Sequence, residues 1–310
     1  MGIEVRNASF GYGSEPVICG LDLPVRDNRV LTILGRNGVG KTTLLKCMMG
    51  FLKWRSGETL LDGRPLKSYS LSQVWSRISY VPQAKRSPFA FSVLDTVVMG
   101  LNASAKAFSV PSREDYEKAH AALADLGVES IADKDSSEIS GGELQMVLIA
   151  RALVSDPRIL ILDEPESNLD MRNQLRVLGA IQKISERGTT TCIINTHFPE
   201  HALLVSDDTL FLGGGSHMLL GPTPDVVTRE NIRDFYGVEA AIVPVGTDLI
   251  SGGAGECTGG ASGSSAGGPG ERGESAGGRG HRTVYPFRIC SDAGPGCRAD
   301  QCKVQTAVAV

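Results

Sequence analysis

The sequence contains no apolar run that approaches the roughly 20 residues a membrane-spanning helix requires. Its first residues, Met1 to Arg6, also lack the basic and then apolar order of a secretory signal peptide. Charge of one sign is not in excess, because the formal net charge of −4 gives no general electrostatic reason to bind nucleic acid or an anionic membrane surface. We therefore expect a cytoplasmic protein that binds no nucleic acid and reaches a membrane only through a partner.

Cysteine is also scarce, with seven residues in a chain of 310. Cys19, Cys47 and Cys192 each stand alone among apolar residues, which suits reduced core thiols better than a disulfide framework. The spacing of the later cysteines lacks a tight C-x-x-C pair, and a fourth ligand is open between Cys257 and His281. A metal site and a segment with reactive thiols therefore both stay open for the cysteines beyond residue 250: Cys257, Cys290, Cys297 and Cys302.

Large apolar residues nearly disappear between residues 251 and 282, which hold 13 of the 37 glycines together with serine and alanine. This composition is typical of a flexible linker. Its strand-like flanks, Ala241–Val245 and Thr283–Ile289, predict either a hairpin with an expanded connection or a wholly disordered tail. The chain is 41% hydrophobic overall, enough to bury a sizeable core, and we expect an α/β domain over residues 1–236 and a C-terminal extension over 237–310.

The most specific motif is a glycine-rich stretch between the apolar run Val30–Leu34 and an apparent helix over Thr43–Met49. It fits the pattern G-x-x-x-x-G-K-[ST], in which backbone N–H groups and a helix N-terminus surround a polyphosphate. We expect Lys41 to reach the β- and γ-phosphates of a nucleotide, and the Thr42 hydroxyl to coordinate Mg²⁺. The predicted nucleotide contacts here are Gly35, Arg36, Asn37, Gly38, Val39, Gly40, Lys41, Thr42 and Thr43.

Residues 1–35 read as antiparallel strands, with an alternating run from Ile3 that breaks at Gly11–Gly13 and resumes over Val17–Leu23. Tyr12 lies at this break. A flat aromatic side chain ahead of a phosphate loop can stack on an adenine ring, since such stacking is worth about 1–3 kcal/mol. Taken alone, Tyr12 also fits an ordinary turn or strand aromatic.

Three later strands end in polar side chains. The first ends at Gln83, the second at Asp163 and Glu164, and the third at His197. The second strand is continuously apolar from Ile159, which indicates burial on both faces, as in a parallel sheet. Because ligands gather at the carboxyl ends of such strands, these side chains are expected at one sheet edge with the phosphate loop.

The chemistry of these side chains suits nucleotide hydrolysis. We expect Asp163 to hold Mg²⁺ through its water shell, and Glu164 to orient and deprotonate the water that attacks the γ-phosphate. Gln83 can touch Mg²⁺ or the attacking water, and His197 can contact the γ-phosphate. Each residue alone would fit a solvated or core side chain. Their shared edge with the phosphate loop favours the catalytic interpretation.

Helical periodicity replaces strand signals over about residues 84–155, which predicts a helical insertion. Its last helix opens with Ser140, Gly141, Gly142 and Glu143. Small residues at the positive end of a helix can expose N–H groups and form a second anion site. An ordinary capping box, with Ser140 as the cap and Glu143 as its partner, explains the same residues and is compatible with that site.

Together these motifs resemble the ATP-binding subunit of ATP-binding cassette (ABC) transporters, over about residues 1–236. The motifs occur in the family's order: the aromatic Tyr12, Walker A from Gly35 to Thr42, the Q-loop Gln83, the signature from Ser140 to Glu143, Walker B ending at Asp163 and Glu164, the D-loop from Ser167 to Asp170, and the switch His197. Ile139 and Glu143 depart from the usual leucine and glutamine, and Glu166 stands where threonine is common. None of these departures removes a phosphate-contacting group.

The resemblance implies an α/β fold of the P-loop NTPase class, with an ABC-type antiparallel β subdomain, a parallel-sheet RecA-like core and an inserted helical subdomain. It implies ATP and Mg²⁺ as cofactors. Two subunits would face head to tail, so that each ATP lies between one chain's Walker A and the other chain's signature. The Gln83 region would pass closure and opening to an integral membrane permease, and a substrate-binding protein outside the membrane would be an indirect partner.

The stretches Tyr80–Gln83 and Phe91–Gly100 look most like the importers of iron chelates, haem and cobalamin. This implies a place at the cytoplasmic face of the cell membrane. Importers of molybdate, tungstate or another small nutrient, and efflux ATPases, remain alternatives. Soluble cassette ATPases that act on DNA or ribosomes fit less well, because only about 100 residues separate Walker A from the signature and the chain has one cassette.

Overall fold

The structure, a computed structural model, describes residues 2–84, 91–103, 110–242 and 287–290. An antiparallel sheet holds the first strands in the order β2-β1-β4-β5. Its members are β1 (Ile3–Tyr12), β2 (Glu15–Pro24), β4 (Ser56–Leu61) and β5 (Arg64–Pro65). β1 continues through Gly11 and Tyr12, which pair with Pro16 and Glu15 after a register shift at Phe10, so the break predicted at Gly11–Gly13 comes only at the turn after Tyr12.

A six-stranded sheet has the order β10-β9-β3-β8-β7-β6. All its strands are parallel except β10, which pairs antiparallel with β9. The prediction that Val30–Leu34 is antiparallel is wrong. As β3 it lies between the parallel strands β8 and β9. All five of its residues are buried, as is typical of a strand inside a parallel sheet. The strands are β3 (Val30–Leu34), β6 (Ile78–Val81), β7 (Ile159–Asp163), β8 (Thr191–Asn195), β9 (Asp208–Gly214) and β10 (His217–Pro222).

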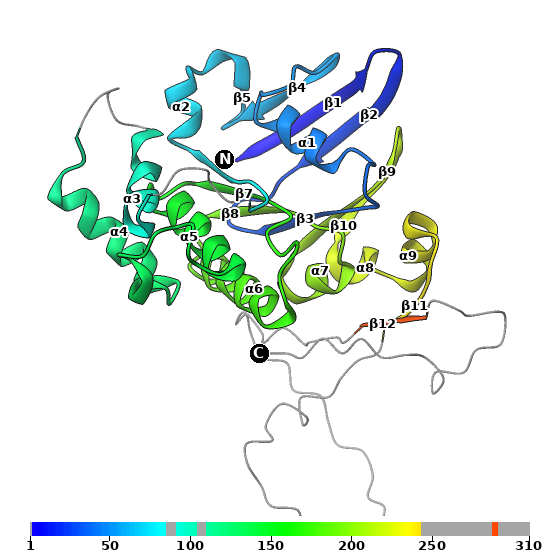
Figure 1. The fold of residues 1–310 in the computed structure, drawn as a ribbon. Coiled ribbons are helices and arrows are strands. Elements are labelled where there is room, and N and C mark those ends of the chain that lie inside the picture. The colour runs from blue at the N-terminus through cyan, green and yellow to red at the C-terminus, as the bar shows by residue number, and fades with distance from the viewer. Residues whose placement is uncertain (1, 85–90, 104–109, 243–286, 291–310) are drawn as a thin grey trace, which may run out of the picture.

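The parallel sheet is covered on both faces. Successive side chains of a strand point to opposite sides, so each strand contributes to both cores. In Figure 1 the antiparallel sheet and α1 (Lys41–Met48) lie above it, and α5 (Gly141–Leu153), α6 (Met171–Glu186) and α7 (Pro199–Val205) lie below. In β7, Ile161 packs in the upper core with the antiparallel sheet and α1. Its neighbours Leu160 and Leu162 pack in the lower core.

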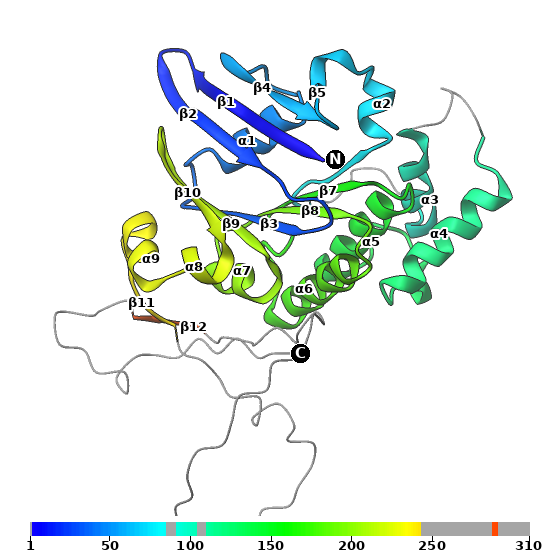
Figure 2. The ribbon, with the colours of Figure 1, turned by 180° about the vertical axis from the view of Figure 1, so that it is seen from behind.

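The helices between β6 and β7 project to one side of the molecule (Figures 1 and 2). They include α3 (Val93–Val98) and α4 (Arg113–Asp125), as the helical periodicity predicts, and they share the lower core with α5. Short helices complete this half of the chain: α2 (Leu71–Trp75) and the 3₁₀ turns η1 (Leu66–Ser68), η2 (Met99–Ala103) and η3 (Glu129–Ile131). The domain boundaries at residues 84, 155 and 236 stay predictions.

Past the β9–β10 hairpin lie two short helices, first α8 (Thr223–Val226) and then α9 (Arg229–Tyr236). The first helix ends because Val227 leaves the helical region, and the Thr228 hydroxyl accepts a hydrogen bond from the Asn231 N–H at 3.3 Å to begin the next helix.

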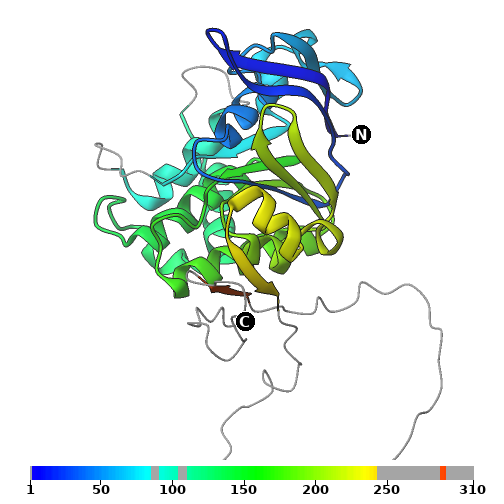
Figure 3. The same ribbon diagram turned by 90° about the vertical axis from the view of Figure 1, so that its right-hand side faces the viewer.

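A small antiparallel sheet follows, in which β11 (Glu239–Ile242) pairs with β12 (Phe287–Cys290) (Figure 3). This pairing agrees with the predicted hairpin of the two strand-like flanks. The glycine-rich residues 251–282 and the positions Cys257, His281, Cys297 and Cys302 lie outside the described residues, so the linker and the metal site stay predictions. Within the described ranges, no helix is long and apolar enough to cross a membrane.

Candidate nucleotide site

Four neighbouring parallel strands, β3, β8, β7 and β6, carry the predicted residues at their carboxyl ends. The phosphate loop follows β3, and His197 follows β8. Asp163 and Glu164 stand at the end of β7, and Gln83 lies two residues beyond β6. The topology therefore brings these segments to the single sheet edge that the sequence predicts.

Three glycines of the phosphate loop have positive φ values, and two of them also lie close against neighbouring strands. Gly35 and Gly40 have φ values of +155° and +108°, where other residues are strained. A Cβ atom on Gly35 would lie 2.3 Å from the Leu212 carbonyl oxygen, and one on Gly40 would lie 2.4 Å from Val17 Cγ1. The loop is therefore held close to β9 and β2 in a conformation that only glycine can adopt without displacing its neighbours.

Lys41, the first residue of α1, is a buried cation at the positive end of a helix. Its side chain is 4% exposed, and its ammonium donates hydrogen bonds to the carbonyl oxygens of Gly35 at 2.8 Å and Arg36 at 3.1 Å. Burial lowers the pKa of Lys41, while the carboxylates of Glu164 and other nearby acids oppose that shift. A buried ammonium at a helix N-terminus fits a polyphosphate.

Two of the three predicted magnesium contacts, Thr42 and Asp163, touch each other. The Thr42 hydroxyl donates to Asp163 Oδ1 at 3.0 Å, and the Tyr80 hydroxyl donates to Asp163 Oδ2 at 2.9 Å. The Asn195 amide also donates to Asp163 Oδ1 and lies 3.4 Å from the Thr42 hydroxyl. Burial and the Asp163 charge raise the pKa of Tyr80. This carboxylate and hydroxyl are the oxygen ligands that Mg²⁺ prefers, so the residues present fit the ion.

Asn195 and Tyr80 were not predicted as site residues. Asn195 is a fully buried polar side chain at the end of the apolar strand β8, the same signal that identified Asp163 on β7. Tyr80 had no comparable signal, because its hydroxyl reaches Asp163 from the neighbouring strand β6.

A cavity of about 510 Å³ joins this edge to the helical side of the molecule. Thr42, Gln83, Asp163 and Glu164 all line it, so the structure brings Gln83 to the phosphate-loop threonine and the two acids. Its other wall is mostly apolar and comes from α3, η2 and α5 with the adjoining loop: Phe91, Thr96, Met99, Leu144, Leu148 and Arg151.

Glu164 has an unusual backbone, with φ at +49°. Its N–H donates to the Asn195 carbonyl at 2.9 Å, and its Oε2 accepts from the Ser167 hydroxyl at 3.0 Å. A left-handed conformation at a residue other than glycine costs on the order of 1–3 kcal/mol and persists where its surroundings fix it. Here β8 and the predicted D-loop fix the backbone and the carboxylate of the predicted base.

His197 and Tyr12 do not line this cavity. The His197 ring lies against Phe198, with ring centroids 3.9 Å apart, and its Nδ1 is buried without a hydrogen-bond partner among the described residues. Tyr12 is 56% exposed, and its hydroxyl lies 3.4 Å from that of Thr43, beside the start of α1. The phosphate role of His197 and the stacking role of Tyr12 stay predictions.

The predicted signature residues form the capping box that the sequence indicates. The N–H and the hydroxyl of Ser140 donate to Glu143 Oε2 at 2.8 Å and 2.7 Å, and the Glu143 N–H donates to the Ser140 hydroxyl at 3.2 Å. These bonds lower the pKa of Glu143. A Cβ on Gly142 would lie 2.2 Å from Asn173 Cγ, so this glycine permits the approach of α5 to α6. Ser140, Gly141 and Gly142 do not line the cavity that holds Thr42.

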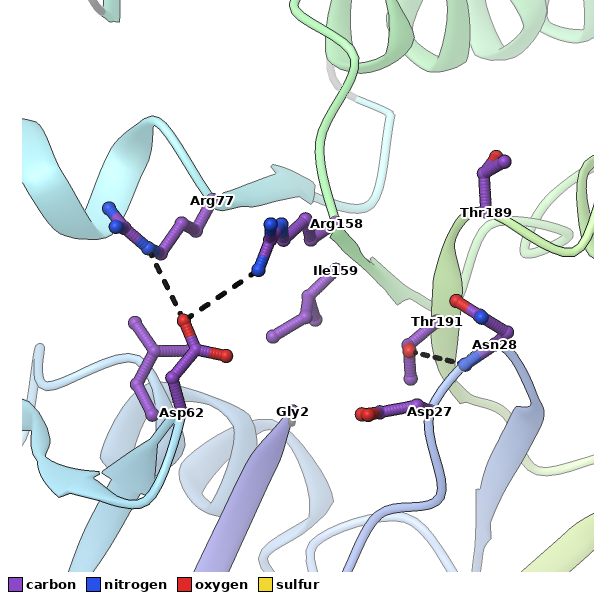
Figure 4. A pocket seen from close by; sticks show the side chains of 10 residues that line it. Gly2, Asp27, Asn28, Asp62, Arg77, Arg158, Ile159, Thr189 and Thr191 are labelled. Carbon is purple, nitrogen blue, oxygen red and sulfur yellow. Dashed lines mark hydrogen bonds and ion pairs between the residues drawn. The ribbon is translucent and has the colours of Figure 1, made fainter.

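A smaller cavity of about 180 Å³ lies at the opposite edge, where β6, β7 and β8 begin (Figure 4). Asp62 faces two arginines there, at 3.5 Å from Arg77 Nε and 4.0 Å from Arg158. The Asn28 N–H donates to the Thr191 hydroxyl at 2.9 Å. These contacts join the turn after β4 and the loop after β2 to the parallel sheet, which explains the cavity as a junction between the two sheets.

Comparisons with known proteins agree with this geometry. A family model for the ABC transporter matches residues 18–167. An "Uncharacterized ABC transporter ATP-binding protein" of Haemophilus influenzae is 34% identical over 234 residues, which cover 76% of this chain and 89% of that protein. A "Probable iron chelatin transport ATP-binding protein" of Helicobacter pylori is 35% identical over 247 residues, with 76% and 93% covered.

Among solved structures, a metal-chelate type ABC transporter in an inward-facing conformation is similar to this chain, with 30% sequence identity and a TM-score of 0.70. The match covers 79% of this chain and 92% of that chain. With the phosphate loop, Asp163, Glu164 and Gln83 gathered at one sheet edge, the chain belongs to the ABC transporter ATP-binding proteins and is an ATPase.

Proposed function

We propose that this ATPase energises the import of a metal chelate through a membrane permease at the cytoplasmic face of the membrane. The observation that carries the ATPase chemistry is the contact of Thr42 with Asp163 beside Lys41 and Glu164. The similarity to metal-chelate and iron-chelatin systems supports the substrate class.

Within one chain, Lys41 would hold the phosphates, and Thr42 and Asp163 would hold Mg²⁺, which would neutralise charge on the phosphates. Tyr12 stacks on the adenine ring. Glu164 takes a proton from the attacking water, and Gln83 and His197 orient the water and the terminal phosphate. Ser167 supports this arrangement, because its hydroxyl holds one oxygen of the Glu164 carboxylate.

The site is completed by a second copy of the chain. Ser140 to Gly142 and Glu143 sit at the N-terminus of α5, away from the cavity that holds Thr42. The exposed end of that helix suits a phosphate carried by another subunit. A head-to-tail homodimer therefore places two ATP molecules between phosphate loop and signature.

The permease docks where the cavity opens beside Gln83. Phe91 and Met99 are each 40% exposed on its rim, and Phe51, 56% exposed, packs against Trp75 and Tyr80 next to it. Exposed apolar side chains gathered beside a polar site are typical of an interaction surface. Movement of Gln83 on hydrolysis then reaches the membrane subunit directly.

Iron-chelate, haem or cobalamin import is the first candidate for the cargo. A hemin import protein of Bradyrhizobium diazoefficiens is 33% identical, but so is a molybdate import protein of Haemophilus influenzae, and a manganese transport protein of Bacillus subtilis is 31% identical. Import of molybdate or another small nutrient is therefore the second candidate, and efflux is a third.

Glu164→Gln tests the catalytic assignment. We expect the variant to bind ATP with wild-type affinity, to lose at least about 100-fold in kcat, because a general base contributes about 10²–10⁴-fold, and to elute as an ATP-dependent dimer. Glu117→Gln, in an exposed ion pair on α4, is the matched control and should hydrolyse normally. Residual hydrolysis by Glu164→Gln above a tenth of the wild-type rate would reject Glu164 as the base.

The cargo is tested with the full chain and the permease encoded beside its gene, reconstituted in liposomes with the neighbouring binding protein. A ferric chelate, haem, cobalamin and molybdate are each supplied in turn. Stimulation of ATP hydrolysis and uptake by one of the first three supports chelate import. Stimulation by molybdate alone would replace that assignment.

A further inference from the structure

A charged side chain that the proposed mechanism does not use lies buried behind the nucleotide site. Glu166, two residues after Glu164, is 0% exposed. Burying a carboxylate is costly unless it is paired and hydrogen-bonded. This position is also one at which the chain departs from the threonine that is common in the family, so the charge requires an explanation.

Two side chains beyond the end of β8 hold one oxygen of this carboxylate. The Thr196 hydroxyl donates a hydrogen bond to Glu166 Oε1, and Nδ1 of His201 lies 3.4 Å from the same atom. The second contact is an ion pair when the imidazole is protonated. Glu166 Oε2 is buried and has no hydrogen-bond partner in the described ranges. Thr196 therefore supplies the hydrogen bond that this carboxylate has in the described ranges, and His201, whose Nδ1 makes no hydrogen bond there, is its close neighbour.

The same contacts reach His197 through Phe198. The Thr196 hydroxyl accepts a hydrogen bond from the Phe198 N–H at 3.2 Å. The Phe198 ring contacts both histidine rings, with centroids 3.9 Å from His197 and 4.7 Å from His201. Because Phe198 is held through both its backbone and its ring, a shift of Thr196 or His201 displaces the surface on which the His197 ring rests.

In the other direction, Glu166 belongs to the turn that fixes Glu164. The Ser167 N–H donates to the Glu164 carbonyl at 3.1 Å, and the Leu169 N–H donates to the Glu166 carbonyl at 3.3 Å. The Ser167 hydroxyl holds the Glu164 carboxylate. One buried carboxylate thus links the turn of the proposed base to the loop of the proposed phosphate contact.

We propose that Glu166 is a positioning residue for ATP hydrolysis, which holds Thr196 and His201 and so fixes the His197 loop relative to the turn that carries Glu164. This inference rests on the roles proposed above for Glu164 and His197. Since Glu166 lies behind these residues, it acts on the hydrolysis rate and leaves the affinity for ATP unchanged.

The test compares Glu166→Gln, His201→Asn and the double variant in the full-length protein. We expect each single variant to lose about tenfold in kcat, with KM and the Kd for ATP within twofold of wild type. The double variant should fall no further than the slower single variant, because both changes interrupt the same connection between Glu166 and the His197 loop. Thermal unfolding is measured on every variant.

The chain offers a matched control of the same chemistry. His217 Nε2 lies 2.9 Å from Asp234 Oδ2, and the His217 ring stacks on Phe235 at 4.2 Å. This histidine and carboxylate lie half-exposed on β10 and α9, and Phe235 is buried on α9. His217→Asn and Asp234→Asn should keep wild-type kcat.

If Glu166→Gln does not fold, Phe198→Leu breaks the ring contact with the carboxylate intact and should give the same tenfold loss in kcat.

Wild-type kcat in Glu166→Gln or Phe198→Leu would overturn the proposal, whatever the unfolding temperature. A rise in KM at constant kcat would also overturn it, and so would additive losses in the double variant. Glu164→Gln is assayed alongside: if it is inactive while Glu166→Gln hydrolyses normally, only this inference fails. Retained hydrolysis in Glu164→Gln instead rejects the catalytic assignment on which the inference rests.

Discussion

The amide of Asn195 joins the two proposed magnesium ligands, because it donates to Asp163 and lies within reach of Thr42. Asn195→Asp would put a second carboxylate against Asp163, in place of a donor. We expect kcat with Mg²⁺ to fall about 100-fold, since like charges at this distance disfavour the ionised pair. Nucleotide binding measured in EDTA should change less than threefold.

Thr209→Val is the control for the Asn195 prediction. Thr209 is equally buried on β9, and its hydroxyl lies 2.9 Å from that of Thr223, away from the nucleotide edge. This variant should lose stability and keep its activity. An Asn195→Asp variant with wild-type hydrolysis would show that Asp163 needs no donor at this position.

Tyr12 offers an exposed ring beside the start of α1. Tyr12→Ala should raise the KM for ATP by about tenfold and leave kcat unchanged, because stacking on a base is worth about 1–3 kcal/mol and acts on binding alone. Tyr12→Phe keeps the ring and should behave as wild type. Equal effects of the two changes would assign the role to the hydroxyl, against the stacking proposal.

The residues that could be predicted from the sequence stand at the ends of strands. Asp163 and Gln83 were placed correctly because parallel strands deliver their carboxyl ends to one edge, whatever their order in the sheet. Tyr80 and Tyr236 were missed because their contacts join residues far apart in the chain, whereas Asn195 has the same strand-end signal as Asp163. The Tyr236 hydroxyl accepts a hydrogen bond from the Gly35 N–H at 3.1 Å, which no local pattern reveals.

At the scale of elements, α5 and α4 begin with the same capping box. Ser112 and Asp115 repeat on α4 the reciprocal bonds that Ser140 and Glu143 make on α5. Loss of such a cap costs about 1 kcal/mol. Ser140→Ala and Ser112→Ala should therefore lower the free energy of unfolding by similar amounts, measured by urea denaturation.

Only Ser140→Ala should also slow ATP hydrolysis, because only α5 presents its N-terminus to the ATP of the second subunit in the proposed dimer. An equal loss of activity in Ser112→Ala would attribute the effect to stability alone. Unchanged hydrolysis in Ser140→Ala would contradict the proposed role of this serine.

Element types were predictable where the apolar pattern is strong, as in the periodic α4 and the continuous apolar run of β7, but two arrangements were not. Val30–Leu34 follows antiparallel strands in sequence and yet joins the parallel sheet, because its partners β8 and β9 begin 161 and 178 residues after it. The division of α8 from α9 depends on the conformation of Val227, which no local sequence pattern discloses.

For the whole molecule, we expect two core thiols to lower the free energy of unfolding at alkaline pH. Burial raises the pKa of Cys47 and Cys192 from 9.0 to about 12. Because the pKa of each thiol returns to its ordinary value on unfolding, the protonated thiols stabilise the folded state fully below pH 9. This stabilisation is lost as the pH rises toward 12. Each thiol lowers the free energy of unfolding by about 1.4 kcal/mol per pH unit in this window.

Urea unfolding between pH 8 and 10.5 measures this slope. The double variant Cys47→Ala, Cys192→Ala should have a shallower slope above pH 9 and a lower stability at pH 8. An unchanged slope would show that other groups, such as the buried hydroxyls of Tyr80 and Tyr236, dominate the alkaline response.

The place of β3 has a consequence for synthesis of the chain. In the described part of the protein, its sheet partners are β8 and β9, and the first glycine of the phosphate loop is bonded to Tyr236. When residues 30–42 have just emerged from the ribosome, the strands that pair with β3 and the tyrosine that bonds to the phosphate loop have not yet been synthesised. ATP can therefore bind and stabilise this protein only after nearly the whole cassette has been translated. Binding stabilises the completed domain and does not assist the folding of its first strands.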